Sequence, residues 1–372
     1  AKAGEGAQWE KEWQARFDRW AAAFPDLARE WALVVKGDLP SDWDAEVPTF
    51  AEGGDVATRM ASGKVLNGLA HRIPHLLGGA ADLAPSTETW LKGYPDIRPG
   101  DYAGRNLHFG VREHAMGSVT NGLVLHGLKA YCAGFLIFSS YMIPPIRYSS
   151  MMAIPTVFVY THDSIGLGED GPTHQPIESL VHLRSIPGNT VIRPADATET
   201  AAAWKLAVQR RIGEGPVCLI FSRQKLKVID RQRYPAADNL RFGAYVLSDD
   251  DQAEVILIGT GSEVGLCMSA AEALRQKGRR VRVVSMPSCE LFLRQPQSYQ
   301  DQVLPPSTKA RVTVEALTTL GWHRFAGPAG RCLGLDHYGA SAPGDVLFRE
   351  FGFTVENVVK LAEESMSKGE AR

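Results

Sequence analysis

Large apolar side chains recur at helical intervals through the first 31 residues. They follow one another at steps of three or four positions, which places them on one face of a helix. Pro25 interrupts the run, and we expect it to kink or restart the helix. Aromatic side chains at helical spacing usually pack onto a core, and we expect the same here. The stripe consists of Trp9, Trp13, Phe17, Trp20, Phe24, Leu27 and Trp31.

Turn-forming residues follow this stripe, so residues 1–47 are predicted to form a helical arm and interdomain linker. Residues 48–233 then alternate helical segments with short apolar runs. Buried strands separated by helices are typical of βαβ units with a mostly parallel sheet. Asp196, with Glu199 three residues later, predicts the start of one helix. The predicted strands are residues 76–79, 107–110, 157–161, 190–193 and 217–222.

A second and smaller unit of the same kind is predicted at residues 242–372, after a linker at residues 234–241. Its helix begins at Ser262 and is expected to stop at Gly278. Its predicted strands are residues 255–258, 281–285, 312–315 and 332–335. The expected fold class is therefore α/β, with two successive domains of mostly parallel sheets flanked by helices.

Charge and cysteine content narrow the functional classes. The 372 residues carry 40 basic and 42 acidic side chains, a net charge of −2, so no overall positive field favours nucleic acid or an anionic membrane. The apolar stretches fall short of the roughly 18 residues that a membrane span needs. The five cysteines stand singly, which predicts reduced thiols in the cytoplasm. We expect neither a membrane nor a nucleic acid as partner.

A glycine-rich loop directly follows the predicted strand at residues 157–161, and it contains His162, Asp170 and His174. In open parallel sheets, ligands bind outside the carboxyl ends of the strands, so this loop is a candidate site. Histidines and carboxylates could also bind a metal ion. Their spacing fits no familiar zinc motif, and we predict no metal site in this chain.

Glu113 lies where a predicted strand passes into a helix. An acid in the first helical turn complements the helix dipole, so taken alone Glu113 would be a helix cap. Further along this helix, Gly117 and Gly122 lower helix propensity. We expect them to allow close approach of another backbone, at a subunit interface. Phe135, Phe138 and Tyr141 follow at steps of three, a pattern that core packing would also explain.

Five motifs together resemble the transketolases, which are thiamine diphosphate enzymes. They occur in the family's order and cover the chain as that family's pyrimidine-binding domain followed by its C-terminal domain. The family's G-D-G motif does not occur, so the N-terminal domain that holds the diphosphate through magnesium or calcium is absent from this sequence. The motifs are Gly79-Ala-Ala-Asp-Leu-Ala-Pro-Ser86, Gly110-Val-Arg-Glu113, the aromatic cluster, the segment from His162 to Pro176, and Ser222-Arg-Gln224.

The resemblance implies roles for individual residues. Aromatic side chains matching Phe135, Phe138 and Tyr141 stack on the cofactor's pyrimidine, and an acid matching Glu113 hydrogen-bonds its ring nitrogen. Glu113 and His174 would be catalytic, with His174 assisting proton transfer and Asp170 accepting a hydrogen bond from a substrate hydroxyl. The substrate-binding residues would be Arg59, Ser86, His162, Asp170, His174 and Arg223, of which Arg59, Ser86, His162 and Arg223 clamp the phosphate. Family members continue a helix where Pro144 and Pro145 stand, so we expect a kink and a displaced aromatic cluster.

The implied activity is transfer of a two-carbon ketol unit from a ketose phosphate to an aldose phosphate, in the pentose phosphate pathway, by a cytoplasmic homodimer. Without the N-terminal domain the chain is expected to be inactive alone. That domain would be supplied by a longer chain or by a separate subunit. Two alternatives are another thiamine enzyme, such as a deoxyxylulose phosphate synthase, and a non-catalytic dimerisation or regulatory module of the same fold.

Overall fold

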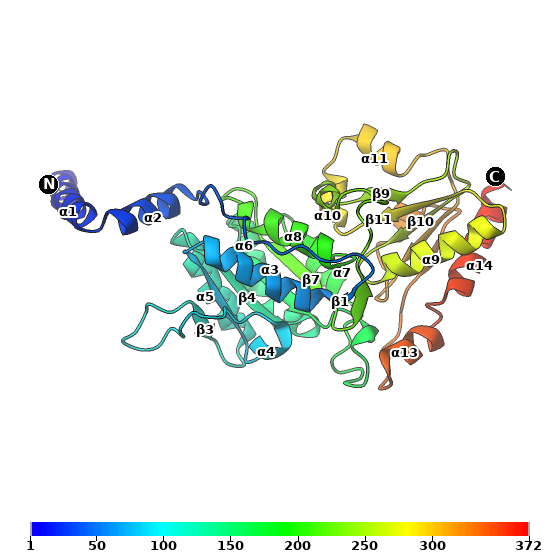
Figure 1. Cartoon of the computed structure of the whole chain (residues 1–372), viewed down its shortest axis with the longest axis horizontal. Helices are drawn as coiled ribbons and strands as arrows, with labels where there is room; N and C mark the ends of the chain where they lie inside the picture. Colours follow the sequence, from blue (N-terminus) through cyan, green and yellow to red (C-terminus); the bar gives the residue numbers. More distant parts are fainter. Residues whose placement is uncertain (1, 371–372) are drawn as a thin grey trace.

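A helical arm extends from the body of the molecule in the computed structural model, which describes residues 2–370 (Figure 1). It consists of α1 (Lys2–Ala23) and α2 (Pro25–Lys36). Pro25 lies in the first turn of α2, where its missing N–H group removes no helical hydrogen bond. Pro25 therefore restarts the helix, as the sequence predicts.

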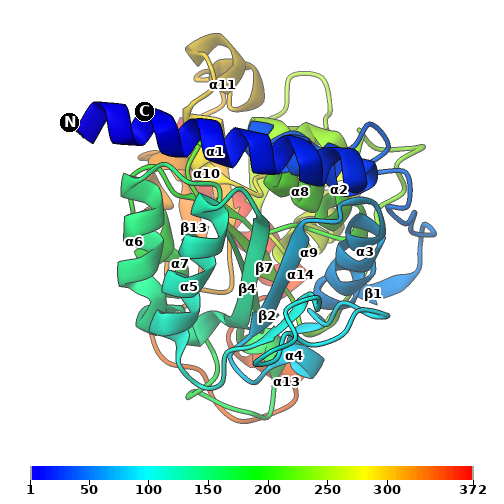
Figure 2. The same cartoon turned by 90° about the vertical axis from the view of Figure 1, so that its left-hand side faces the viewer.

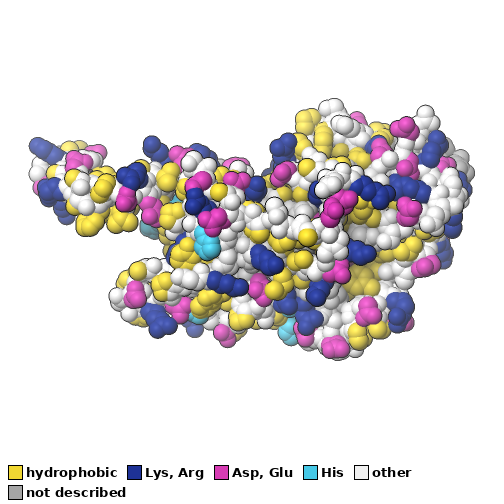
Figure 3. All heavy atoms as spheres, in the orientation of Figure 1, with side chains coloured by type: hydrophobic (Ala, Val, Ile, Leu, Met, Phe, Trp, Pro, Cys, Tyr) yellow, Lys and Arg dark blue, Asp and Glu magenta, His cyan; other side chains and the backbone are white. Residues whose placement is uncertain are grey.

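The aromatic stripe of the arm does not pack onto a core, and that expectation is wrong. Neither α1 nor α2 has a buried residue, and Trp9 and Trp31 are 67% and 44% exposed. The rings contact one another instead, with the Trp13 and Phe17 centroids 5.1 Å apart. Hydrophobic side chains are visible on the arm at the left of Figure 3. Helical periodicity correctly predicted the helix but not its burial.

The first sheet has six parallel strands in the order β3-β2-β4-β5-β7-β6. The strand β4 was not predicted, because most of its residues are small and none is β-branched. The strands are β2 (Leu76–Ala80), β3 (Asn106–His108), β4 (Lys129–Phe135), β5 (Val157–Thr161), β6 (Thr190–Ile192) and β7 (Val217–Phe221).

Helices cover both faces of this sheet, and Figure 2 shows α3 on one side with α5 and α6 on the other. The buried Trp204 of α8 donates a hydrogen bond to Ser62 of α3 at 2.8 Å, which joins the two helices of one face. The predicted cap of α8 is confirmed, since the Asp196 side chain accepts from the Glu199 amide at 2.8 Å. The helices are α3 (Thr58–Arg72), α4 (Ala84–Thr87), α5 (Glu113–Leu125), α6 (Ile143–Met151), α7 (Ser179–Arg184) and α8 (Ala197–Gln209).

Two expectations for the helices beside this sheet need correction. A Cβ at Gly117 would lie 2.9 Å from Pro145 Cβ, so close approach of α6 in the same chain explains this glycine, whereas a Cβ at Gly122 would meet nothing within 4 Å. Pro144 and Pro145 fall in the first turn of α6, after the 3₁₀ helix η1 (Leu136–Met142). They begin a new α-helix and do not kink an existing one.

The second sheet has five strands in the order β13-β12-β10-β11-β9, with β9 antiparallel at one edge. Its four parallel strands coincide closely with the predicted ones, whereas β9 was missed. The strands are β9 (Tyr245–Ser248), β10 (Val255–Gly259), β11 (Val281–Ser285), β12 (Arg311–Val314) and β13 (Arg331–Leu333). The helices are α9 (Glu263–Gln276), α10 (Cys289–Leu293), α11 (Gln297–Val303), α12 (His323–Ala326), α13 (Gly344–Glu350) and α14 (Val355–Glu370).

Short elements complete the structure between and beside the sheets. The 3₁₀ helix η3 (Ala237–Phe242) precedes the second sheet and buries Leu240 completely. A second 3₁₀ helix, η2 (Ile165–Leu167), lies in the glycine-rich loop after β5. The antiparallel pair β1 (Asp55–Ala57) and β8 (Lys225–Lys227) joins the segment before α3 to the segment after β7. This pairing brings Arg59 near Arg223, two residues that are predicted to bind the substrate phosphate.

Candidate active site

The predicted site residues gather at the carboxyl ends of parallel strands. Phe135 is the last residue of β4, His162 follows β5, and Arg223 lies two residues after β7 ends. Ligands bind at this edge in open parallel sheets because the loops there diverge and expose backbone and side-chain groups. The glycine-rich loop after β5 was the expected location of the site, and these side chains lie at that edge of the sheet.

Arg59 and Arg223 are brought together by hydrogen bonds between the segments that carry them. The Thr58 amide donates to Ser222 Oγ at 3.1 Å, and the Ser222 amide donates to Thr58 Oγ1 at 2.7 Å. Arg59 Nη1 then donates to the Ser86 carbonyl oxygen at 2.6 Å. Arg223 Nη1 donates to the carbonyl of Leu167 in the glycine-rich loop at 3.1 Å.

His162 lies beside Arg59 and Arg223, the two arginines that form the cationic group of the site. It is buried and has a left-handed backbone with φ of 60°. Burial, with smaller contributions from the charges of Arg59, Arg223 and His174, lowers the pKa of His162 to about 3. Its Nδ1 atom lies 2.8 Å from Thr161 Oγ1. Because the positive charges of the two arginines disfavour a proton on His162, an anion bound beside them would offset that effect.

The aromatic residues form an open stack beside this cationic group. The Phe135 and Phe138 rings are stacked, with centroids 6.0 Å apart, and Tyr141 lies 6.4 Å from Phe138. His174 meets both phenylalanine rings edge-on, and His162 lies 3.8 Å from the Phe135 ring centroid. Tyr141 is 62% exposed, so the stack is accessible to a planar ring.

The two remaining site residues lie at the margins. Asp170 is exposed on the glycine-rich loop, and Glu113 is half-buried at the start of α5. Within residues 2–370, neither side chain makes a hydrogen bond or ion pair. Glu113 therefore does not act as the cap that its position alone suggests. Its charge adds to the rise in the pKa of Tyr160, a rise that burial dominates.

Sequence reasoning missed two glutamines at the site. Both amide atoms of Gln224 are buried and have no partner among the described residues, and Oε1 of Gln175 is in the same state. A Cβ at Gly166 would lie 2.5 Å from the Gln224 amide, which therefore packs directly against the glycine-rich loop. Both glutamines belong to the quoted motifs, but their spacing did not distinguish them from other loop residues.

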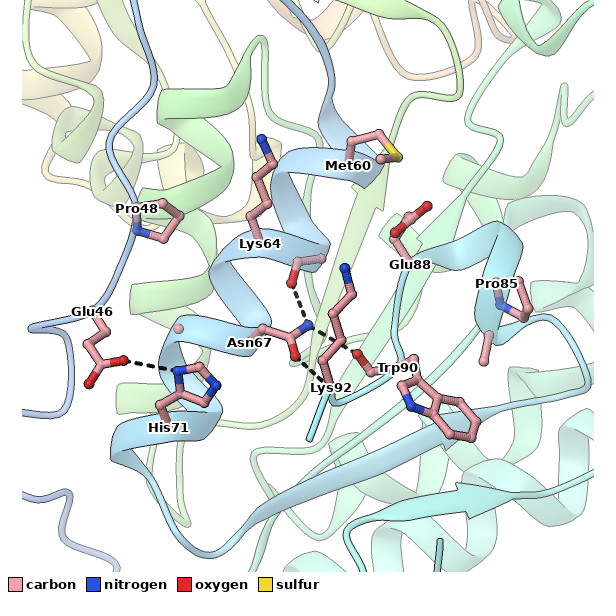
Figure 4. Close-up of a pocket in the computed structure, with 13 residues that line it drawn as sticks. Glu46, Pro48, Met60, Lys64, Asn67, His71, Pro85, Glu88, Trp90 and Lys92 are labelled. Carbon is pink, nitrogen blue, oxygen red and sulfur yellow. Dashed lines mark hydrogen bonds and ion pairs between the residues drawn. The ribbon is translucent and has the colours of Figure 1, made fainter. Parts of the chain in front are cut away.

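A pocket of about 690 Å³ lies outside this site, on the outer face of α3 (Figure 4). Asn67 closes its floor by donating to the Trp90 carbonyl at 3.0 Å and accepting from the Lys92 amide at 2.7 Å. His71 Nδ1 lies 2.9 Å from Glu46 Oε2 at one end. None of the predicted site residues lines this pocket.

Two searches of residues 2–370 gave no candidates. No three or more His, Cys, Asp or Glu side chains come together as potential ligands of a metal ion there. No helix in that range combines the length and the apolar character required to cross a membrane.

The fold and site define a two-domain α/β protein of the thiamine-enzyme type, with two arginines and a buried histidine beside an aromatic stack. Residues 54–228 match the family model "Transketolase, pyrimidine binding domain", and residues 243–354 match "Transketolase-like TK C-terminal domain". The chain belongs to the transketolase family.

Curated relatives agree with this assignment but are much longer. Transketolase of Bacillus subtilis is 45% identical over 366 residues, which are 98% of this chain and 55% of the relative. Transketolase of Aquifex aeolicus is 48% identical over 359 residues, which are 96% and 52% of the two chains. The chain thus spans about half the length of the curated relatives it matches.

Solved structures show the same relationship. A Pichia stipitis transketolase in complex with sedoheptulose 7-phosphate has a TM-score of 0.94 and 37% identity, covering 99% of this chain and 54% of that one. A structure described as a split gene transketolase, inactive beta4 tetramer, has a TM-score of 0.68 at 24% identity. The match covers 84% of this chain and 99% of that one, so a separate chain of this two-sheet fold exists.

Proposed function

We propose that this chain forms part of a transketolase that transfers a two-carbon ketol unit from a ketose phosphate to an aldose phosphate, in the pentose phosphate pathway. The observation that carries the proposal is the convergence of Arg59, Arg223 and His162 beside His174 and the aromatic stack. This arrangement supports an anion site next to a histidine that could exchange protons and a surface for a planar ring. The relatives' names support the reaction.

The cationic group would bind the substrate phosphate. Arg59 and Arg223 supply guanidinium donors, His162 supplies a ring nitrogen, and Ser86 adds a polar group where Arg59 reaches its carbonyl. Asp170 would accept a hydrogen bond from a substrate hydroxyl. His174 would move a proton at the reacting hydroxyl, because imidazole exchanges protons near neutral pH.

The aromatic stack fits the pyrimidine ring of thiamine diphosphate. Phe138 and Tyr141 present accessible faces, and the buried Ser139 hydroxyl beside them has no partner among the described residues. Glu113 would hold a proton between its carboxylate and a ring nitrogen. When bound, the cofactor supplies the nucleophilic carbon for ketol transfer.

The diphosphate and its metal ion require a different source of ligands. Residues 2–370 offer no acidic or histidine cluster for magnesium or calcium. We therefore assign these ligands to the N-terminal part of the family's chain, supplied in the same polypeptide or as a separate subunit. Without it, this chain is proposed to bind the cofactor weakly and to be inactive.

Homodimerisation would occur through the face formed by α5 and α6. Large apolar side chains on or directly after these helices are between 44% and 75% exposed, and burying such a patch against a second copy is favourable. These residues are Val119, Leu125, Tyr148, Met151 and Met152.

The five cysteines form no disulfide, which supports a reducing compartment such as the cytoplasm.

The experiment that tests the activity combines this chain with the N-terminal domain of a relative, fused or co-expressed. The complex, supplied with thiamine diphosphate and magnesium, should convert a ketose phosphate and an aldose phosphate into the exchanged pair. His174→Ala should lower turnover by at least ~100-fold, the lower end of the contribution of a general acid or base. Turnover by the wild type that persists in His174→Ala would contradict the role of this histidine.

A further inference from the structure

The second-sheet domain holds the glycine-rich loop that carries His174 and Asp170. The contact is made by residues 339–344, termed the clasp, and residues 166–175, termed the substrate loop. Gln175 Nε2 donates both to the Gly168 carbonyl and to the Ala340 carbonyl, each at 2.9 Å. Ser341 Oγ donates to the Glu169 carbonyl at 2.5 Å. Gln175 of the substrate loop and Ser341 of the clasp therefore each hydrogen-bond across the boundary between the two domains.

Two glycines of the clasp make this approach possible. A Cβ at Gly339 would lie 1.8 Å from Gln175 Oε1, and a Cβ at Gly344 would lie 2.8 Å from the Gly166 carbonyl oxygen. Neither glycine has a positive φ, so close packing and not backbone conformation explains them. The clasp thus fits the substrate loop with no space for a side chain at these positions.

A buried ion cluster fixes the segment that enters the substrate loop. Asp163, next to His162, pairs with Arg193 at 2.8 Å. Arg193 is fully buried and also pairs with Glu263 of α9 and donates to the Thr260 carbonyl at 2.9 Å. Both ends of the loop region are therefore tied to the second-sheet domain.

We propose that the second-sheet domain is a positioning device for the substrate loop, with Gly339, Ser341 and Gln175 as positioning residues. The role of His174 and Asp170 in this inference rests on the proposed function, but the restraint of the loop does not. Contacts of the clasp orient the two side chains before substrate arrives, which lowers the ordering cost of binding and reaction.

Hydrogen exchange of this chain tests the restraint directly. The amides of Gly171, His174 and Gln175 donate within the loop and should be protected. Gly339→Ala should push the end of the Gln175 side chain away from its carbonyl partners, and exchange at these amides should rise about tenfold, as expected for losing roughly one hydrogen bond. The matched control is Gly265→Ala on α9, where a Cβ meets nothing within 4 Å.

Unchanged exchange in Gly339→Ala, with β10 and β12 still protected, would overturn the proposal. Should that variant fail to fold, Ser341→Ala removes a single hydroxyl from an exposed residue and should raise exchange in the same loop. Unchanged exchange in Ser341→Ala would then overturn it.

A second readout separates positioning from general stability. In the complex with the N-terminal domain, Gly339→Ala should lower kcat/KM for the sugar phosphate about tenfold and leave the Kd for thiamine diphosphate unchanged. Equal kcat/KM in Gly339→Ala and Gly265→Ala would overturn the positioning role. If the wild type lacks ketol transfer while loop exchange responds as expected, the proposed function fails and the restraint stands.

Discussion

At the residue scale, charge and burial act together at His162. Two arginines and a second histidine surround a buried imidazole, whose pKa falls to about 3. The two arginines thus disfavour a proton on His162, and an incoming phosphate would offset their charge.

The cationic group should be detectable without cofactor. Sulfate or a sugar phosphate should raise the melting temperature by binding the folded state, and Arg59→Ala and Arg223→Ala should each remove most of that rise. Thermal scans with and without 10 mM-scale ligand measure it, with Arg19→Ala in the exposed arm as the matched control. An undiminished rise in both site variants would disprove the phosphate assignment.

Glu113 provides the second prediction at this scale. Glu113→Gln keeps the shape of the side chain but cannot share a proton with the cofactor ring. Turnover of the complex with the N-terminal domain should fall by at least ~100-fold, while the oligomeric state stays unchanged. Exchange of the cofactor's C2 proton for deuterium follows this step, and wild-type exchange rates in the variant would show that Glu113 has another role.

His75 should make the protein sensitive to acid. Burial, with smaller contributions from the charges of Lys129 and Arg105, lowers its pKa to about 4. At pH 5 the unfolded chain binds a proton at an ordinary histidine pKa near 6.5 and the folded protein does not, so stability falls as the pH drops below that value. Between pH 7 and pH 5 this histidine should account for roughly 2 kcal/mol.

Urea unfolding of the wild type and His75→Leu at both pH values measures this contribution. Leucine has a similar volume and no proton to bind, so the variant should lose less stability on acidification by that amount. The lowered pKa of His162 acts in the same direction, and the variant keeps this part of the dependence. Identical pH dependence in the two proteins would contradict the assignment to His75.

At the element scale, the arm shows that periodicity and burial are separate properties. The stripe of aromatics predicts a helix correctly because its spacing depends only on the 3.6-residue repeat. Whether that face is covered depends on what lies opposite, and in residues 2–370 nothing buries it.

Deleting α1 should therefore leave the melting temperature of the body within about 2 °C, because none of its residues is buried and little apolar area is lost. Circular dichroism during heating measures this. As a contrast, Leu66→Ala in α3 removes a fully buried side chain and should cost roughly 2–5 kcal/mol. A large drop on deleting α1 would show that the arm stabilises the body.

At the scale of the whole molecule, the two sheets are joined by a buried network of ions. The charges of Glu263, Asp163 and Glu315 raise the pKa of Arg193 against the lowering effect of its burial. Arg184 adds a pair of hydrogen bonds to Glu315 at 2.8 and 2.9 Å. The network connects α9 and the residue after β12 in one domain to α7 and the residues after β5 and β6 in the other.

Arg193→Leu should destabilise the chain by about 3–5 kcal/mol, because it leaves buried carboxylates without their partner. Lys277→Ala breaks an exposed pair with Glu363 and should cost at most about 1 kcal/mol. Chemical unfolding of both variants compares the two. Similar small losses would mean that the buried network contributes no more than a surface pair.

The sequence by itself determined most elements and the family. Short apolar runs, helical spacing, the cap at Asp196 and each quoted motif depend on residues within a few positions of one another, where local sterics and hydrogen bonding decide the conformation. The four-residue edge strand β9 and the strand β4, which is built largely of small residues, were missed. The exposed arm and the intrachain role of Gly117 also depended on what packs opposite them.

Tertiary structure alone decided how the site is held. Ser341 and Glu169 are 172 positions apart, and Arg193 and Glu263 are 70 apart, so no local pattern relates them. The pKa of His162 likewise depends on burial and on the charges of Arg59 in α3, Arg223 between β7 and β8, and His174 in the substrate loop. Contacts of this kind arise only when distant segments pack, because burial and low dielectric set their strength.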